Sequence, residues 1–353
     1  MKKTIAPKIS IVVPIYNTPD NFLLNNLSHL EKQTMKEIEV ILVDDGSHRK
    51  TADICDDYVD RNSNFKVIHK KNAGLSAARN TGVDNSSGEY ILFVDGDDYV
   101  EYDTCEQLYP KENKPDVVCA CMSKDMGGII KKYDYSLFKD NKLYINEECK
   151  FFRDNVLNFY ANVSSVNGKL YKRSFLLNNK LEHNEELKTG IEGIDFCFRL
   201  YDKAKSVLFL ERYIYNYVFN NNSITETPST KNYQLILKGF YCIKNYIDLK
   251  GENMDNKERL NTLLYNRIVF FLVTTMISGF FNPKIKQGYR ERVKQSKNFI
   301  EDNLLIESLQ KYDKSKVDSF RNIIIFCIKN KLFLIIHIFS TVRYIQKYKL
   351  NKF

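Results

Sequence analysis

Four short apolar runs, rich in β-branched residues, recur in the first hundred residues with helix-like segments between them. The runs cover residues 8–14, 38–43, 65–69 and 90–94. The first run is continuous rather than alternating in polarity, which is typical of a strand buried on both faces of a sheet, and the second also reads as a buried strand. Strands that alternate with helices in this way predict an α/β fold with a mostly parallel, Rossmann-like sheet.

The segments around these runs complete the expected organisation. Residues 21–33 and 75–85 have the apolar spacing of helices, and Ser47 is placed to cap a helix after the second strand. Residues 116–122 read as a further strand, and from about residue 233 the pattern is helical. The sequence therefore predicts an α/β domain followed by a helical C-terminal region.

Two long apolar stretches fall in the helical part. Residues 268–281 are nearly unbroken, but the stretch is only fourteen residues long and ends before Asn282. Residues 323–339 are interrupted by Lys329 and Lys331. Because a helix needs about 20 apolar residues to cross a membrane, neither stretch predicts a transmembrane span.

The basic residues are concentrated toward the C-terminus. The formal net charge is +9, and residues 231–353 contain 23 Lys and Arg against 10 Asp and Glu. Between 320 and 353 there is no acidic residue; the basic ones are Arg321, Lys329, Lys331, Arg343, Lys347, Lys349 and Lys352. Interleaved with apolar side chains, they fit an anionic membrane surface. They equally fit a helical subdomain with a solvated basic face. No nucleic-acid-binding motif accompanies the charge, so nucleic acid is not an expected partner.

The cysteines and the N-terminus indicate the compartment. The eight cysteines contain no CxxC pair and have no histidine cluster beside them. The basic N-terminus is followed by an apolar run too short for a signal peptide. These features predict reduced thiols in a cytoplasmic protein.

Two acidic clusters follow predicted strands, Asp-Asp at 44–45 and Asp-Gly-Asp-Asp at 95–98. Ligands of an open parallel sheet bind beyond the carboxyl ends of its strands. Carboxylates there can accept a base N–H or ribose hydroxyls, or hold Mg²⁺ or Mn²⁺ on a diphosphate. Asp and Gly also form ordinary turns, but two clusters at adjacent strand ends favour a site. Neither GxGxxG nor GxxxxGK[ST] is present, which disfavours dinucleotide oxidoreductases and P-loop NTPases.

Four motifs occur in order: SIVVPIYN at 10–17, VDDGS at 43–47, KNAGLSAARN at 71–80 and FVDGDD at 93–98. Together they resemble the inverting family-two glycosyltransferases of the GT-A fold, over roughly residues 8–225. The resemblance implies a GT-A catalytic domain at 1–228, with a nucleotide-sugar half at about 1–122 and an acceptor half at about 123–228, and a basic helical region at 229–353.

The resemblance also implies roles for individual residues. Those expected around the nucleotide-sugar are Pro14, Tyr16, Asn17, Asp44, Lys71, Asn72, Arg79 and Asp95. Within this set, Asp44 would accept the N–H of a uracil base and Asp95 would contact the ribose. Asp97 would hold a Mn²⁺ or Mg²⁺ ion between the two phosphates. The simpler alternatives are a solvated helix residue for Arg79 and a core aromatic for Tyr16.

The general base is the point at which the sequence departs from the family. The family's base is usually the Asp of a Glu-Asp pair before an apolar helix, and here the matching residues are Glu192 and Gly193. Three interpretations stay open. Glu192 acts as the base, Asp195 replaces it, or the protein is catalytically weak or inactive.

Two further segments resemble the acceptor side of the family. Lys169 lies in NGKLYK at 167–172 and would contact a phosphate, or would simply be a surface lysine. Tyrosines at 213, 215 and 217 alternate as in a strand, and residues 222–225 resemble the loop that closes the domain.

The resemblance implies a hexosyltransferase-type enzyme of surface polysaccharide (capsule) synthesis. It would move a sugar from a nucleotide-diphosphate donor, UDP-linked by preference, to a hydroxyl of a glycan or lipid-linked glycan, with inversion. A polyprenyl-phosphate glycosyltransferase and a non-catalytic nucleotide-sugar-binding scaffold are the alternatives. The expected location is the cytoplasm, with attachment to the inner face of the membrane left open.

Overall fold

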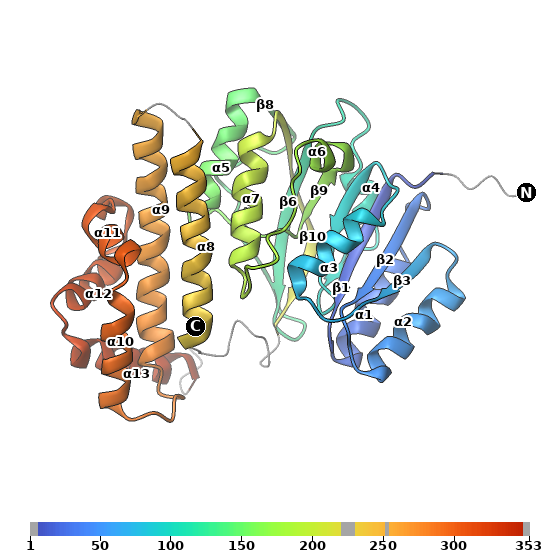
Figure 1. The fold of residues 1–353 in the computed structure, drawn as a ribbon. Helices are drawn as coiled ribbons and strands as arrows, with labels where there is room; N and C mark the ends of the chain where they lie inside the picture. Colours follow the sequence, from blue (N-terminus) through green and yellow to red (C-terminus); the bar gives the residue numbers. More distant parts are fainter. Residues whose placement is uncertain (1–5, 220–229, 251–253, 349–353) are drawn as a thin grey trace, which may run out of the picture. The chain divides into compact units, whose positions relative to one another are not determined.

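The computed structural model describes residues 6–219, 230–250 and 254–348. Contacts divide the chain into two compact units (Figure 1). The first unit comprises Met1–Val156, Tyr160–Lys188 and Glu192–Asn221, and the second comprises Leu157–Phe159, Thr189–Ile191 and Asn222–Phe353. The expected domain boundary at 228 and the expected closing loop at 222–225 lie outside the described residues.

The first unit is built on one mixed sheet. Among the described residues ten strands pair in the order β3-β2-β1-β4-β9-β6-β10-β5, with β7 beside β6 and β8 beside β10. The strands are β1 (Ile9–Ile15), β2 (Ile38–Asp44), β3 (Phe65–His69), β4 (Tyr90–Phe93), β5 (Tyr99–Val100), β6 (Val117–Asp125), β7 (Ile130–Lys132), β8 (Lys142–Ile145), β9 (Lys169–Lys172) and β10 (Ser206–Val218).

The helices of this unit are mostly short. They are α1 (Asp20–Glu31), α2 (Arg49–Arg61), α3 (Leu75–Asp84), α4 (Thr104–Leu108), α5 (Lys150–Val156), α6 (Arg173–Asn178) and α7 (Ile191–Lys203). The last begins one residue before the unit resumes at Glu192.

The predicted α/β class is confirmed, and the four expected strands are β1 to β4. They pair in parallel, with Val12 beside Ile41 on one side and Phe93 on the other. All seven residues of β1 are buried, as the continuous apolar run predicted. Since β1 lies between β2 and β4, the order of strands along the sheet reverses there.

The part of the sheet beyond β4 is less regular. β9 runs antiparallel to both β4 and β6, whereas β6 and β10 are parallel to each other. The thirteen residues of β10 contain two register shifts, so its face changes along its length. The alternating tyrosines predicted only the end of this strand.

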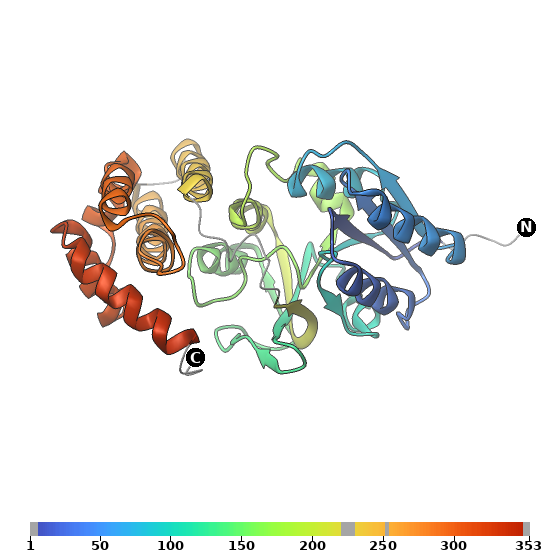
Figure 2. The same ribbon diagram turned by 90° about the horizontal axis from the view of Figure 1, so that it is seen from below.

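The second unit is helical in its described residues, and Figure 2 shows α13 running along the outside of this unit. Its helices are α8 (Thr230–Leu249), α9 (Met254–Thr274), α10 (Tyr289–Ile300), α11 (Asn303–Lys311), α12 (Ser319–Lys329) and α13 (Phe333–Tyr348). A π-helical turn, Thr275–Phe280, continues α9, and α9 packs against α8, α11 and α12.

The length of α9 corrects one sequence expectation. Within the described part of the chain, one helix, Asn256–Phe280, has the length and apolar composition needed to cross a membrane. The sequence estimate of fourteen residues was too short because the helix begins well before its most apolar part. Of its most apolar window, 67% is buried inside the protein, as in the central helix of a helical domain.

Candidate functional site

The carboxyl ends of β1, β2 and β4 meet at the point where the strand order reverses. Such a point leaves a crevice in which ligands of open α/β sheets bind. Tyr16 and Asn17 follow β1, Asp44 ends β2, and Asp95 comes shortly after β4. The fold therefore brings these four candidates to one edge of the sheet.

The residues after β1 join it to the segment after β2. Asn17 adopts a left-handed backbone conformation (φ 48°). Its N–H donates to Ser47 Oγ at 3.0 Å, and its Oδ1 accepts from the His48 N–H at 2.8 Å. The expectation that Ser47 caps a helix is wrong, because α2 begins after His48 and the Ser47 hydroxyl faces Asn17. Tyr16 is 56% exposed, so the core-aromatic alternative is also wrong.

Asp44 is buried with both carboxylate oxygens engaged. Oδ1 accepts from the Ser47 N–H at 2.8 Å, and Oδ2 lies 2.7 Å from His69 Nδ1. Burial acts to raise the pKa of Asp44, but hydrogen bonds from Ser47 and His69 outweigh it and hold that pKa below its usual value. Asp44 is therefore a fixed, ionised acceptor at the end of β2.

His69 links stability to pH. Hydrogen bonds to Asp44 and then to Asp56 raise the pKa of His69 above 6.5. A raised pKa of this kind contributes stability that is complete below the unfolded value and is lost as pH rises through the folded value. We expect the stability advantage of the wild type over His69→Gln to be complete at acidic pH and to shrink as the pH rises through the raised pKa of His69. Urea unfolding at several pH values measures it, and an advantage independent of pH would contradict the assignment.

Asp45 holds the loop that precedes α3, a role that the sequence did not indicate. Its carboxylate accepts from the N–H groups of Ala73 and Gly74, at 3.0 and 2.7 Å for the shortest contacts. Lys71 and Asn72 lie on this loop with exposed side chains. They are thus placed beside the β2 end by Asp45, rather than against the buried part of the site.

Asp95 is the centre of the buried part. Its Oδ1 accepts from the Arg79 guanidinium at 2.7 Å, and its Oδ2 accepts from Asn167 Nδ2 at 2.8 Å. Arg79 is only 4% exposed, so it is not a solvated helix residue. Burial acts to lower the pKa of Arg79, but the charge of Asp95 outweighs it and the pKa is raised. Asn167, the first residue of the NGKLYK segment, joins β9 to this pair, a contact that the sequence did not predict.

The turn at 95–98 is fixed by long-range hydrogen bonds. Asn26 Nδ2 donates to the carbonyls of Asp95 and Asp98 at 3.1 and 2.8 Å. The Tyr215 hydroxyl accepts from the Asp95 N–H at 3.2 Å and donates to Asp98 Oδ2 at 2.6 Å. A Cβ on Gly96 would lie 3.2 Å from the carbonyl oxygen of Pro14, so glycine lets the turn pack against buried Pro14 at the end of β1.

The hydroxyl of Tyr215 makes this turn sensitive to a single substitution. Tyr215→Phe would leave the partly buried Asp95 N–H and one oxygen of the buried Asp98 carboxylate without this partner. We expect the free energy of unfolding to fall by about 1–3 kcal/mol. Urea unfolding measures the change, with Tyr16→Phe, whose side chain is largely exposed, as the matched control. An equal effect of both substitutions would contradict the bridging role.

Asp97 has an unfavourable environment for its charge. Burial, and next the charge of Asp95, raise the pKa of Asp97 to about 6. No cation pairs with Asp97 among the described residues. The same part of the chain has no group of three or more His, Cys, Asp or Glu side chains that could hold a metal. Asp97, whose pKa is raised, would lie beside the expected diphosphate. A single carboxylate of this kind fits Mg²⁺ or Mn²⁺, because such ions take one or two carboxylates and complete their shell with phosphates and water.

The first turn of α7 carries the candidates for a general base. Glu192 is 4% exposed and lies close enough to Arg79 for its charge to help raise the pKa of that residue. Asp195 instead accepts two hydrogen bonds from Arg199, at 3.0 and 2.7 Å, both on Oδ2. Glu192 therefore lies near the Asp95–Arg79 pair, whereas Asp195 forms an ion pair with Arg199 within α7.

Lys169 is not a surface lysine, because it is 2% exposed. Its ammonium donates to the carbonyl oxygen of Ser165 and, at 3.4 Å, to that of Asn167. These contacts hold the loop that presents Asn167 to Asp95. Lys169 therefore helps to set the shape of the site through these two carbonyl contacts.

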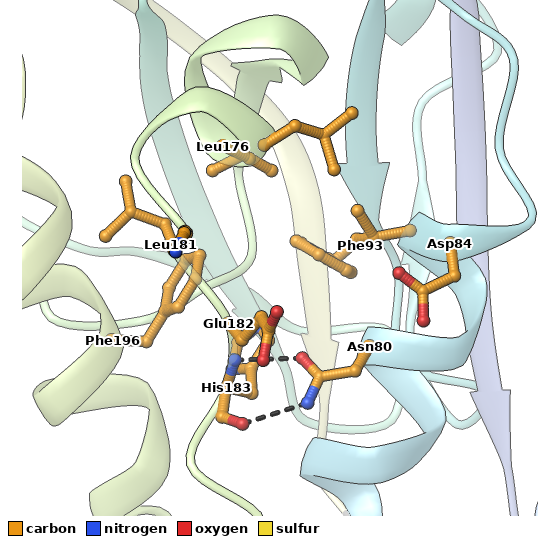
Figure 3. Close-up of a pocket in the computed structure, with 11 residues that line it drawn as sticks. Asn80, Asp84, Phe93, Leu176, Leu181, Glu182, His183 and Phe196 are labelled. Atoms are coloured by element: carbon orange, nitrogen blue, oxygen red, sulfur yellow. Dashed lines mark hydrogen bonds between the residues drawn. The ribbon is translucent and has the colours of Figure 1, made fainter.

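A small cavity lies elsewhere in this unit, between α3, α6 and the segment before α7 (Figure 3). It encloses about 50 Å³, room for little more than one water molecule. His183 is stacked on Phe196 at 4.0 Å, and both its ring nitrogens lack a hydrogen-bond partner in the described structure. None of the candidates from the nucleotide motifs lines this cavity.

The chain is similar to known proteins over most of its length. The model of "Glycosyl transferase family 2" matches residues 10–178. EpsH of Bacillus subtilis (strain 168) is 28% identical over 96% of each chain. The uncharacterized glycosyltransferase EpsJ of the same strain is 32% identical over 81% of this chain and 83% of its own. The crystal structure of S. aureus TarS 1–349 in complex with UDP-GlcNAc superposes with a TM-score of 0.66, at 22% identity, over 98% of this chain and 93% of that one.

Proposed function

The chain belongs to glycosyl transferase family 2, and on that premise we propose that it transfers a sugar from a UDP-sugar to a hydroxyl group, with inversion. The acceptor would be a glycan or a lipid-linked glycan in surface polysaccharide synthesis. The observation that carries the proposal is the meeting of Asp44, Asp95 and Asp97 at the reversal of strand order.

The preference for a uridine nucleotide rests on Asp44. A uracil ring offers one N–H, and an ionised carboxylate held by Ser47 and His69 is a suitable acceptor for it. The fold neighbour TarS, which was crystallised with UDP-GlcNAc, supports a donor of this class. We assign the exposed residues Tyr16, Lys71 and Asn72 to the rim of the nucleotide site.

Asp95 would bind the ribose, and Arg79 would act as its positioning residue. Because the guanidinium is buried and paired with Asp95 at 2.7 Å, Arg79 reaches the donor through that carboxylate. Asn167 holds the other oxygen, so the carboxylate is oriented from both sides before a donor arrives. Such preorganisation lowers the cost of ordering the bound state.

The reaction would be a single displacement at the anomeric carbon. The acceptor oxygen forms a bond to C1 from the face opposite the nucleotide, while the C1–O bond to UDP breaks and UDP leaves with the electron pair. Glu192 would take the hydroxyl proton as general base. Asp97 would hold Mn²⁺ or Mg²⁺, which when bound supplies positive charge to the leaving diphosphate.

Two alternatives share the same donor pocket. A polyprenyl-phosphate glycosyltransferase would use a lipid phosphate as acceptor, and its product would be a lipid-phosphate sugar. A nucleotide-sugar-binding scaffold would bind the donor without turnover, and Gly193 is the residue that favours it. We place all three in the cytoplasm, where nucleotide-sugars are used.

The experiment is hydrolysis and binding of a panel of UDP-, GDP- and dTDP-sugars, with Mn²⁺ or with EDTA. We expect release of UDP from one donor in the presence of Mn²⁺ and its loss in EDTA. Binding of UDP without turnover, even with a glycan or polyprenyl-phosphate acceptor, would favour the scaffold. Neither binding nor turnover with any donor would refute the proposed function.

A further inference from the structure

The last two described helices expose many large apolar side chains. We call this set the apolar face; its members, exposed by 37–61%, are Ile323, Phe326, Leu332, Leu334, Ile335, Ile338, Val342 and Ile345. They occur within about two dozen residues, on α12, α13 and the turn between them. Soluble proteins seldom expose so many large apolar side chains within so short a segment unless a partner covers them.

The orientation of α13 is fixed by its opposite side. The Ser340 hydroxyl lies 2.6 Å from the carbonyl oxygen of Ile277 and 2.8 Å from that of Phe281. Phe333 and Ile336 are buried on the same side. The exposed residues of α13 therefore point away from the helical unit because of anchoring contacts, and the face is a stable feature of the fold.

The segment that carries the apolar face also carries positive charge. Residues 319–348 contain no Asp or Glu. Lys329, Lys331 and Arg343 are exposed, while Arg321 is paired with Asp318, which precedes the helix. An apolar strip bordered by cations, with no anion in the same segment, matches a surface that is apolar inside and negatively charged at its edge.

We propose that the apolar face of α12 and α13 docks on an anionic phospholipid surface. With sixteen residues, α13 is shorter than the roughly 20 residues of a spanning helix, so it lies in the plane of the interface. The apolar side chains enter the acyl boundary, and the lysines and arginine meet the phosphates.

A second copy of the chain is a poorer occupant of this face. A symmetric dimer would place the same patch against itself, so the cations around the strip would face cations with no acidic residue of 319–348 to pair with them. Like charges brought together in this way oppose association. The lipid surface supplies the missing negative charge.

The inference does not depend on the identity of the donor. It adds to the proposed function that an enzyme docked in this way works on an acceptor held at the membrane. Vesicle binding and sugar transfer are separate measurements, so failure of one leaves the other interpretable.

Co-sedimentation with vesicles of phosphatidylcholine, alone or with phosphatidylglycerol, tests the proposal on the full chain. The wild type is expected to sediment with the mixed vesicles. The variant Leu334→Gln/Ile338→Gln/Val342→Gln is expected to bind them about tenfold more weakly or worse. Leu249→Gln, which changes an 86% exposed leucine on α8, is the matched control and should bind as the wild type does.

A second variant tests the charge. Lys329→Gln/Lys331→Gln/Arg343→Gln is expected to lose the preference for phosphatidylglycerol, whereas Lys286→Gln/Lys294→Gln/Lys297→Gln, with the same net charge, should keep it. Circular dichroism and the melting temperature show whether each variant is folded. The proposal fails if the wild type ignores vesicles, or if folded variants bind no differently from their controls. It also fails if the apolar variant only dissociates a dimer in sedimentation velocity.

Discussion

Replacing Glu192 with Gln is expected to lower kcat by about 10²–10⁴-fold, because the amide cannot accept the proton of the acceptor hydroxyl. Glu192 lies near Arg79, whose guanidinium binds Asp95, and so belongs to the part of the site where the sugar would lie. The substitution keeps the size of the side chain, so donor binding should change little. Steady-state kinetics with the donor found in the panel measures both quantities.

Replacing the neighbouring Gly193 with Asp is the matched substitution that adds a carboxylate to this turn. An ideal Cβ at Gly193 lies 3.4 Å from Val166 Cγ2 and 3.6 Å from the Ser164 carbonyl oxygen, which is ordinary contact. A β-carbon is therefore accommodated at the position where the family usually has its base. Since Gly193 is in the first turn of α7, Gly193→Asp is expected to stabilise the helix by about 0.5–1 kcal/mol.

The double variant Glu192→Gln/Gly193→Asp distinguishes the open interpretations. Recovery of much of the lost kcat would show that a carboxylate is needed in this turn. Asp195→Asn is the control, and its expected effect is on stability, because it weakens the ion pair with Arg199. If folded Asp195→Asn loses as much kcat while Glu192→Gln loses none, Asp195 is the base. Full activity of both would refute a carboxylate base on α7.

The first half of the sheet could be predicted from local sequence. Strands β1, β2 and β4 are buried along nearly their whole length, so each leaves a mostly apolar run in the chain, whereas β3 at the edge of the sheet is mostly half-buried. The polar residues that follow them collect at one edge because parallel strands share a direction. The sequence alone therefore predicted the sheet edge that carries Asp44, Asp95 and Asp97.

The contacts that shape the site could not be predicted in the same way. Tyr215 reaches Asp98 across 117 positions, and Asn167 reaches Asp95 across 72. The NGKLYK segment and the alternating tyrosines pointed to these two regions, but no local pattern predicted which partner each residue would reach. Their roles depend on how β9 and β10 enter the sheet, and the register shifts of β10 leave no simple alternation to read.

The burial of two charged residues could not be predicted from the sequence for a related reason. Arg79 lies on α3 and Lys169 on β9, and charged side chains such as these usually face solvent. Only the tertiary structure supplies the compensating groups, a carboxylate for Arg79 and two carbonyls for Lys169. A buried charge needs such partners, so its environment follows from the fold rather than from its neighbours in sequence.

Replacing Asp97 with Asn is expected to lower kcat by about 10³-fold, a value typical of losing electrostatic stabilisation of the leaving group. The remaining turnover should no longer respond to Mn²⁺. In the absence of metal, the free energy of unfolding of Asp97→Asn should exceed that of the wild type by about 1–3 kcal/mol at neutral pH. Burial and Asp95 raise the pKa of Asp97 to about 6, so its ionised form opposes folding above that pH, and the amide removes this charge.

The two effects have opposite signs, and this makes the test specific. A substitution that merely damaged the site would lower both kcat and the melting temperature. Asp57→Asn, at an exposed position of α2, is the control and should change neither. Isothermal titration of UDP with Mn²⁺ should show weaker binding only for Asp97→Asn. If that variant keeps its Mn²⁺-dependent turnover and is no more stable than the wild type, the charge at 97 has another purpose and the metal assignment fails.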